Sequence, residues 1–286
     1  MKICCLYDPK FRVDASNKKA LNKFIVAAKK LNHEFKLITR RNINKVSDCD
    51  ALFIRVITHP NNYTFTASRI AKENKIKVVD DPDSIRKCAN KVFLFELFRK
   101  HGIPIPRTRI VNKRTKRRGV EEFGYPFVIK LPDSFGSKGV KKINNYKEYM
   151  KYSRSMFRRS ALIILQEFMP TKFDWRVGVL NRKVLFVCKY YMAKNHWKII
   201  KDSKNPLNRT GRAFVLKRKK INSELKKIAL HVAKLIGNGL YAVDIKEYKG
   251  KYYVIEANDN PTIDSGVEDR KDRDVYERII KFLTRK

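Results

Sequence analysis

The sequence is poor in acidic residues. It has 28 Asp and Glu against 66 Lys and Arg in 286 residues, which gives a formal net charge of +38 at pH 7. It also lacks any apolar run near the roughly 20 residues that a membrane-spanning helix requires. The N-terminal stretch carries a charge from its second residue, unlike a signal peptide. We therefore expect no membrane-spanning segment, no signal peptide and no membrane partner.

Cysteine and histidine are scarce and scattered. The five cysteines are odd in number and form no C-x-x-C pair. This usage predicts reduced thiols in a cytoplasmic protein, without a disulfide framework or a zinc site. The five histidines show no H-E-x-x-H pattern, so the sequence gives no support for a histidine-based metal site.

Apolar residues make up 43% of the chain and aromatic residues 11%, which excludes disorder for most of it. The excess of Lys and Arg has two interpretations that stay open. One is a general lysine bias spread over solvated surface, and the other is a surface that meets a polyanion.

Strand and helix patterns alternate in the first quarter of the chain. We expect strands at 2–7, 35–38, 51–56 and 76–79, and helices at 17–31 and 63–73. This alternation predicts βαβ units with a parallel sheet. The charged, turn-rich segment 80–83 marks a domain boundary.

The rest of the chain predicts an α+β region in two lobes. We expect a helix at 84–101, strands at 107–111, 125–131 and 161–168, and a helix at 145–157. The segments 113–118, which is basic, and 133–140, which contains glycine, are expected to be loops. The last part predicts a hairpin at 175–180 and 183–190, a helix capped by Ser223 and ended by Gly237, a second hairpin at 241–248 and 252–258, and a helix at 274–283.

Two carboxylates and an amide fall on one face of the second hairpin. A three-residue turn at 249–251 sets Asp244 opposite Glu256, with Asn258 two residues along, and keeps the apolar side chains together on the other face. Adjacent carboxylates repel unless a cation neutralises them, and oxygen ligands suit Mg²⁺. The alternative is a solvated polar face with Lys246 as the partner of the carboxylates.

Magnesium sites of this kind hold phosphates, which call for cations and for backbone amides. Lys130 ends an apolar strand, and Lys91 opens an apolar helix, where the helix dipole disfavours it. The segment 133–140, which follows a predicted strand, could cradle a phosphate with its glycines, although a plain hairpin loop is the alternative. The chain has neither G-x-x-x-x-G-K-[ST] nor G-x-G-x-x-G.

These motifs together resemble the ATP-grasp superfamily, in its RimK-type glutamate ligase and glutathione-synthase-like branch. The resemblance runs from about residue 80 to the end of the chain and rests on several motifs in one order. These motifs are Asn90-Lys91, Pro126-Phe127-Val128-Ile129-Lys130, Gly136-Ser137-Lys138-Gly139-Val140, Gln166-Glu167-Phe168, Asp174-Trp175-Arg176-Val177, Asp244-Ile245 and Glu256-Ala257-Asn258-Asp259-Asn260-Pro261.

The resemblance implies an ATP-grasp fold of the α/β and α+β class. It implies an N-terminal βα domain (1–83) followed by a central lobe (84–168) and a C-terminal lobe with the metal site (169–286), the two lobes clamping ATP. The chain departs from relatives between 111 and 127, where they often have a helix and this sequence is short and basic.

The resemblance also implies site roles. ATP and Mg²⁺, with Mn²⁺ as the alternative ion, are the expected cofactors. The expected metal ligands are Asp244, Glu256 and Asn258. Lys130 and Arg176 are expected to be catalytic, Arg176 facing the acyl phosphate or a carboxylate. The expected nucleotide-binding residues are Lys91, Lys130, Gly136, Ser137, Lys138, Gly139, Gln166, Glu167, Phe168 and Asp174.

The reaction implied by the resemblance activates a carboxylate as an acyl phosphate, which an amine then attacks to form an amide. The expected partners are small carboxylate and amine substrates or an acidic peptide or protein acceptor, such as a tail that receives glutamate, and a homo-oligomer is compatible with relatives. Two alternatives stay open: a nucleic-acid- or ribosome-associated binding protein on this scaffold, and a kinase-like phosphoryl transfer.

A few further residues have two interpretations. His196 and Trp197 are substrate-facing or part of a packed surface loop. Cys188, Met192 and the pair Tyr190-Tyr191 are expected to be core residues.

Overall fold

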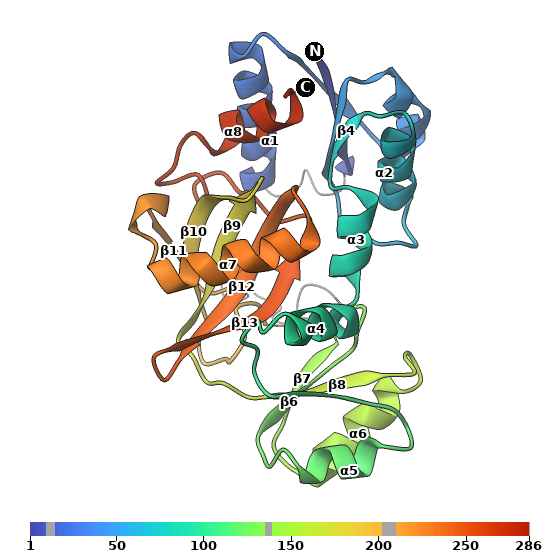
Figure 1. Cartoon of the computed structure of the whole chain (residues 1–286), viewed down its shortest axis with the longest axis vertical. Helices are drawn as coiled ribbons and strands as arrows, with labels where there is room; N and C mark the ends of the chain where they lie inside the picture. The colour runs from blue at the N-terminus through green and yellow to red at the C-terminus, as the bar shows by residue number, and fades with distance from the viewer. Residues whose placement is uncertain (10–14, 135–138, 202–209, 286) are drawn as a thin grey trace.

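The computed structural model describes residues 1–9, 15–134, 139–201 and 210–285. Within them the chain forms a four-stranded parallel sheet, a four-stranded antiparallel sheet and a five-stranded antiparallel sheet. Figure 1 shows the parallel sheet at one end of an elongated molecule, the four-stranded antiparallel sheet at the other end, and the five-stranded sheet between them.

The parallel sheet has the strand order β2-β1-β3-β4, so the strand that begins the chain lies inside it. Its side chains pack into two cores, one on each face, as the predicted βαβ pattern requires. The elements of this layer are β1 (Lys2–Tyr7), α1 (Ala15–Lys30), β2 (Glu34–Ile38), the 3-10 helix η2 (Arg40–Asp48), β3 (Ala51–Arg55), α2 (Tyr63–Glu73) and β4 (Lys77–Val79).

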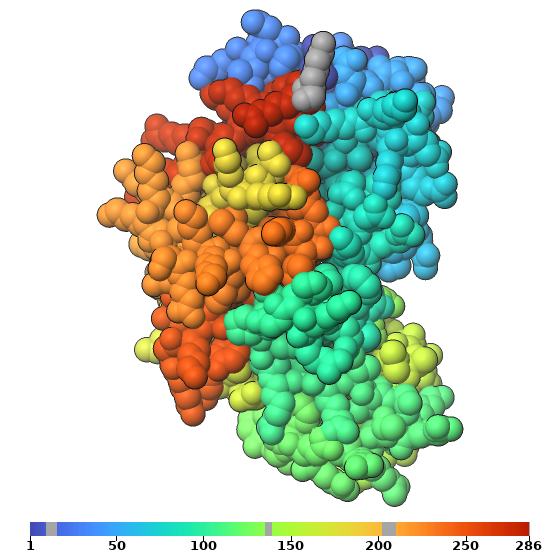
Figure 2. Space-filling view, in the orientation of Figure 1, coloured from blue at the N-terminus to red at the C-terminus, as the bar shows by residue number. Residues whose placement is uncertain are grey.

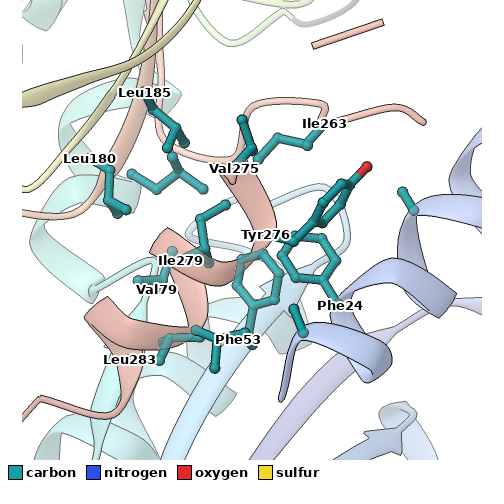
Figure 3. Packing of buried hydrophobic residues seen from close by; sticks show 14 of the residues in the cluster. Phe24, Phe53, Val79, Leu180, Leu185, Ile263, Val275, Tyr276, Ile279 and Leu283 are labelled. Atoms are coloured by element: carbon teal, nitrogen blue, oxygen red, sulfur yellow. The ribbon is translucent and has the colours of Figure 1, made fainter. Parts of the chain in front are cut away.

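The last helix of the chain, α8 (Val275–Leu283), returns to this first layer. It packs beside α1, where the rings of Phe24 and Tyr276 meet edge to face with centroids 4.7 Å apart. Figure 3 shows Phe53 of β3 and Val79 of β4 at the same contact, together with Ile279. Figure 2 shows the C-terminal part of the chain, in red, between the blue N-terminal layer and the yellow and orange part of the chain.

The four-stranded antiparallel sheet has the order β5-β8-β6-β7, and two helices pack against it. The basic segment 113–118, which was expected to be a loop, is partly helical. The glycine-containing segment 133–140 ends in a strand that the sequence pattern did not predict. The elements of this small lobe are β5 (Thr108–Val111), α5 (Lys116–Glu121), β6 (Phe127–Lys130), β7 (Val140–Ile143), α6 (Tyr146–Met156) and β8 (Ile163–Glu167).

The five-stranded sheet has the order β11-β10-β9-β12-β13. The first hairpin turns at Asn181 and Arg182, as predicted. The elements are β9 (Phe173–Leu180), β10 (Lys183–Tyr191), β11 (Ala213–Leu216), which was not predicted, the 3-10 helix η4 (Arg218–Lys220), α7 (Ser223–Ile236), β12 (Leu240–Tyr248) and β13 (Lys251–Asn258). Asn222, and not Ser223, caps α7, because its side chain accepts from two backbone amides of the first turn.

The helix expected at 84–101 is two helices, α3 (Pro82–Ala89) and α4 (Lys91–Lys100). Asn90 separates them in an extended conformation, and its side chain accepts a hydrogen bond from the amide of Phe93 at 3.1 Å, which starts α4. Both helices contribute to the core of the five-stranded sheet. The domain limits at 83 and 168 stay a prediction.

The β12–β13 hairpin pairs Asp244 with Glu256, as predicted, but a different turn and a β-bulge produce this register. Tyr248 pairs with Lys251 across a two-residue turn in which Lys249 and Gly250 have φ of 50° and 74°, instead of the expected three-residue turn. That turn alone would set Asp244 opposite Ile255. A β-bulge between Asp244 and Ile245 shifts the register by one residue, and Asp244 therefore faces Glu256.

One further expectation is wrong. Cys4 of β1 and Cys49, which follows η2, are joined by a disulfide with Cα atoms 5.9 Å apart, although they lie 45 residues apart in sequence. The other three cysteines, Cys5, Cys88 and Cys188, are free and buried. Among the described residues no helix is long and apolar enough to cross a bilayer. The cytoplasmic setting stays a prediction.

The contact of α8 with the parallel sheet leads to a first prediction. Ile279 is fully buried against this sheet, so Ile279→Ala removes packed methyl groups and leaves a cavity. We expect the free energy of unfolding in urea to fall by about 2–5 kcal/mol. Val26→Ala on α1, where the side chain is 66% exposed, is the matched control and should change it by less than about 0.5 kcal/mol. Equal effects of the two substitutions would contradict the packing role of α8.

Candidate active site

A cavity of about 550 Å³ lies between the small-lobe sheet and the five-stranded sheet. This volume is in the range of small-molecule and cofactor sites. Most of the residues predicted for the site line it. The predicted residues that line the cavity are Lys91, Lys130, Gln166, Glu167, Phe168, Asp174, Arg176, Asp244, Glu256 and Asn258.

The wall of the cavity formed by the five-stranded sheet carries the three predicted oxygen ligands. Asp244 of β12 pairs with Glu256 of β13, and the side-chain amide of Asn258 donates to Asp244 Oδ2 at 3.3 Å. Arg176 of the neighbouring strand β9 donates from Nε to Asp244 Oδ1 at 2.7 Å and from Nη2 to Oδ2 at 2.9 Å. Burial raises the pKa of Asp244, and the guanidinium opposes that rise. Arg176 thus neutralises this carboxylate in a bidentate pair.

Lys91 connects the two walls of the cavity. It is the first residue of α4 and is only 5% exposed. Its ammonium lies 2.8 Å from Glu256 Oε1 and also donates to the carbonyl of Ser134, at the start of the glycine-containing segment. Its backbone amide donates to Pro132 O at 3.1 Å. The ion pair offsets the unfavourable position of a cation at a helix N-terminus.

Lys130 faces the same space from β6 of the small lobe. Its ammonium donates to Gln166 Oε1 at 2.6 Å, and Gln166 in turn donates to Thr108 Oγ1 at 2.9 Å. Gln166 therefore orients Lys130 but, as a neutral amide, supplies no negative charge. Burial lowers the pKa of Lys130 to about 8 from its usual 10.5. Such a buried cation gains by meeting an anion.

The structure adds Lys246, which was not predicted for the site, as the partner of the predicted residue Asp174. Lys246 lines the cavity and lies 2.6 Å from Asp174, and it also donates to Thr171 Oγ1 at 2.7 Å. Lys246 was considered only as a partner of Asp244 and Glu256. The strand period already placed it on the face of Asp244, and this was the signal available in the sequence.

One end of the cavity has an aromatic and apolar wall. Phe168 follows β8 and meets the ring of Trp197 edge to face, with centroids 5.8 Å apart. Lys198 donates to the carbonyl of Val140 at 2.7 Å and so joins the segment after β10 to the small lobe. Both Trp197 and Lys198 line the cavity, in keeping with the substrate-facing interpretation.

The parallel sheet supports the cavity through the segment that follows β13. Arg55, at the end of β3, donates to the carbonyl of Pro261 at 3.1 Å, and Thr58 donates to Asp259 Oδ2 at 2.8 Å. These contacts hold a segment whose residues Thr262 and Asp264 line the cavity. The first layer therefore contributes to the site by positioning this segment.

The predicted glycine-containing loop is only partly described. Gly136, Ser137 and Lys138 lie outside the described residues. Gly139 has φ of 71°, a conformation that favours glycine, and its carbonyl accepts from the amide of Leu131 at 3.0 Å.

The oxygen donors fit a magnesium ion by their chemistry. Asp244, Glu256 and Asn258 offer two carboxylates and an amide from one hairpin face, and Mg²⁺ prefers such oxygen ligands with one or two carboxylates. No group of three or more His, Cys, Asp or Glu with metal-binding geometry occurs in the described parts of the chain. The donor set therefore suits a cation that is also bound by phosphates and water.

The comparison with known proteins agrees with this geometry. A family model for the RimK-like ATP-grasp domain matches residues 88–283. The chain is 30% identical over 224 residues to alpha-aminoadipate–LysW ligase LysX of Sulfolobus acidocaldarius, across 75% of this chain and 76% of that protein. The chain belongs to the RimK-like ATP-grasp family.

A further relative is a probable alpha-L-glutamate ligase of Vibrio atlanticus, which is 26% identical over 209 residues, or 72% of this chain and 66% of that protein. Among solved structures, D-alanine–D-alanine ligase of Bacillus anthracis with ATP has a TM-score of 0.74 at 17% identity, covering 99% of this chain and 96% of that one. A RimK domain ATP-grasp protein of Sphaerobacter thermophilus has a TM-score of 0.71 at 17% identity, covering 99% of each chain.

These findings confirm the predicted ATP-grasp fold. They also confirm the predicted class of enzyme, an ATP-dependent ligase that forms an amide bond. The roles of individual residues in this ATP-grasp chain stay a prediction.

The pKa of Lys130 leads to a prediction about pH. The charged and titratable groups that surround its ammonium are Glu256, Lys91, Lys246 and Asp174. Because the folded protein releases this proton near pH 8, we expect ATP affinity to fall as the pH rises through 8, by up to about tenfold per pH unit. Isothermal titration calorimetry between pH 7 and 9.5 measures this fall.

The same pKa shift makes the free energy of unfolding depend on pH in the opposite direction. Between pH 8 and 10.5 the unfolded chain binds more protons at Lys130 than the folded protein does, so the contribution of Lys130 to stability increases with pH.

Lys130→Gln should flatten the pH profile of ATP affinity. Lys189→Gln, which removes an ammonium packed on the rings of Phe173 and Trp175, is the control that should keep the profile. An equally steep profile in Lys130→Gln would contradict the assignment.

Proposed function

We propose that this enzyme uses Mg-ATP to join the amino group of an amino acid to a carboxylate of an acidic peptide or protein. The single observation that carries the proposal is the cavity, which Lys91 and Lys130 line together with the carboxylates of the five-stranded sheet. Lys91 and Glu256 both line it and form an ion pair of 2.8 Å. Two relatives support the substrate class by their names, since one is a LysW ligase and the other a probable glutamate ligase.

In this proposal Lys91 and Lys130 bind the phosphates of ATP. Both are nearly buried, so their charges act at low dielectric on the transferred phosphoryl group. The apolar end of the cavity, with Phe168 and Trp197, takes the adenine. Asp244, Glu256 and Asn258 would hold Mg²⁺, which neutralises phosphate charge when it is bound.

The chemistry then needs two steps. An oxygen of the substrate carboxylate attacks the γ-phosphorus of ATP and releases ADP, which leaves an acyl phosphate. The amine attacks the acyl carbon, inorganic phosphate leaves, and the amine loses a proton. Arg176 lies on the cavity wall beside Asp244, where its guanidinium can stabilise the negative oxygens of the acyl phosphate. The two sheets enclose this intermediate and limit its hydrolysis.

The test is ADP release by the purified protein with Mg-ATP and a panel of amino acids and acidic peptides, followed by mass spectrometry of the product. We expect Glu256→Gln to fold but to lose ADP release by a factor of about 100 or more. Glu247→Gln is the matched control, because Glu247 lies on β12 but bonds to Trp175 Nε1 at 2.9 Å, outside the cavity. A stable phosphate ester in place of an amide would contradict the proposal.

The charge of the small lobe supports an acidic acceptor. Its basic side chains are largely exposed, and one ion pair, Arg109–Glu122, is found among its described residues. The exposed cations include Arg117 and Arg118 of α5 and Lys147, Lys151 and Arg154 of α6. Unpaired surface cations attract an acidic partner from a distance of about 8–10 Å at physiological salt.

This charge generates a separate prediction. Reversing charge on α6 with Lys151→Glu and Arg154→Glu should raise KM for an acidic acceptor peptide several-fold and leave KM for ATP unchanged. The same change at Lys219 and Lys220 of η4 is the control. If the variants instead lose binding to RNA or DNA with a steep salt dependence, while peptide kinetics stay the same, the nucleic-acid alternative is favoured.

A further inference from the structure

Glu268 is a fully buried carboxylate next to the cavity that the proposed roles leave unexplained. It lies in the segment after β13 and has an exposed fraction of 0%. It accepts a hydrogen bond from the hydroxyl of Tyr190, and its Oε2 accepts one from the amide of Asp264 at 2.7 Å. A buried carboxylate is costly unless polar partners or opposite charge compensate it. These two hydrogen bonds compensate it in part.

Tyr190 links Glu268 to Arg176. The guanidinium carbon of Arg176 lies 5.0 Å from the centre of the Tyr190 ring, a cation–π distance. Burial, and then the charge of Glu268, raise the pKa of the Tyr190 hydroxyl, which therefore stays a neutral donor. Tyr190 and Arg176 both line the cavity. The three side chains thus form a row from the buried carboxylate to the cavity wall.

Arg176 is also paired with a second carboxylate, Asp244, which the proposed function assigns to the metal ion as well. Both oxygens of Asp244 are bonded by Arg176, at 2.7 and 2.9 Å. In the proposed function Asp244 is also a ligand of the magnesium ion. Two cations would then compete for one carboxylate, and they repel each other across a short distance. A group other than Asp244 is needed to keep Arg176 at the cavity.

We propose that Tyr190 and Glu268 are a positioning pair that holds Arg176 at the cavity when Asp244 is shared with a divalent cation. This inference rests on the proposed function. Glu268 does not line the cavity and acts through Tyr190, whose ring supports the guanidinium. The negative charge of Glu268 adds electrostatic attraction for the Arg176 guanidinium.

The main test is Glu268→Gln, which keeps the shape of the side chain and removes its charge. We expect kcat for amide formation to fall about 10- to 100-fold, since small displacements of a catalytic group have this effect. KM for ATP should stay within about twofold. Tyr190→Phe, which keeps the ring and removes the hydroxyl, should lose less, and the double variant should be no worse than Glu268→Gln alone.

Two comparisons separate positioning from a purely structural role. In an Arg176→Lys background, Glu268→Gln should cause no further loss of kcat, because the group it positions is already gone. Asp269→Asn is the matched control: Asp269 is buried in the same segment but bonds to Lys23, the amide of Gly266 and the hydroxyl of Tyr276. It should lower Tm and leave kcat unchanged. An equal loss of kcat in Asp269→Asn would overturn the proposal.

A measurement that does not depend on turnover completes the test. The Nε–H signal of Arg176 in ¹⁵N NMR can be assigned by its loss in Arg176→Lys. We expect this proton to stay protected from solvent exchange when Mg-ADP is added to the wild type, and to exchange faster with Mg-ADP in Glu268→Gln. Unchanged exchange in that variant overturns the positioning pair. Absence of ADP release by the wild type, with the NMR result as expected, overturns the proposed function alone.

Discussion

The structure depends on the balance of positive and negative charge in the cavity between the small-lobe sheet and the five-stranded sheet. Lys91 meets Glu256, and on the five-stranded sheet Arg176 meets Asp244 and Lys246 meets Asp174, so each of these ions has a partner of opposite charge at low dielectric. Lys130 differs, because its hydrogen bond is to the neutral side chain of Gln166 and its pKa is lowered. A polyphosphate would supply the negative charge that Lys130 lacks, in agreement with the proposed binding of ATP in this cavity.

The features that the sequence predicted well are those set by local periodicity. The alternation along β12 and β13 places Asp244, Glu256 and Asn258 on one face, and the structure has this pairing. The turn was predicted with the wrong length, because a bulge compensates for it and bulges leave little trace in a residue pattern. The break at Asn90 was missed because apolar spacing continues across it, although Asn is a common helix cap.

Other features depend on contacts between distant segments and could not be predicted. The disulfide joins Cys4 to Cys49, and scattered cysteines give no indication of a pair. The short edge strand β11 has four residues, and its pairing with β10 is visible only in the folded sheet. Tyr190 was expected to be a core residue, and instead it lines the cavity and contacts Glu268, 78 positions away. The resemblance to a family supplied the roles that local patterns could not.

The position of α8 affects how the chain can fold during synthesis. The parallel sheet comes first in the sequence, yet one of its two cores includes Val275, Ile279 and Leu283, which are made after all three sheets. About the first 80 residues therefore expose an apolar face until α8 has been made and has packed on it. This layer can therefore complete its core only after α8 has been made, whereas the small-lobe sheet, whose core lies between residues 111 and 165, can form earlier.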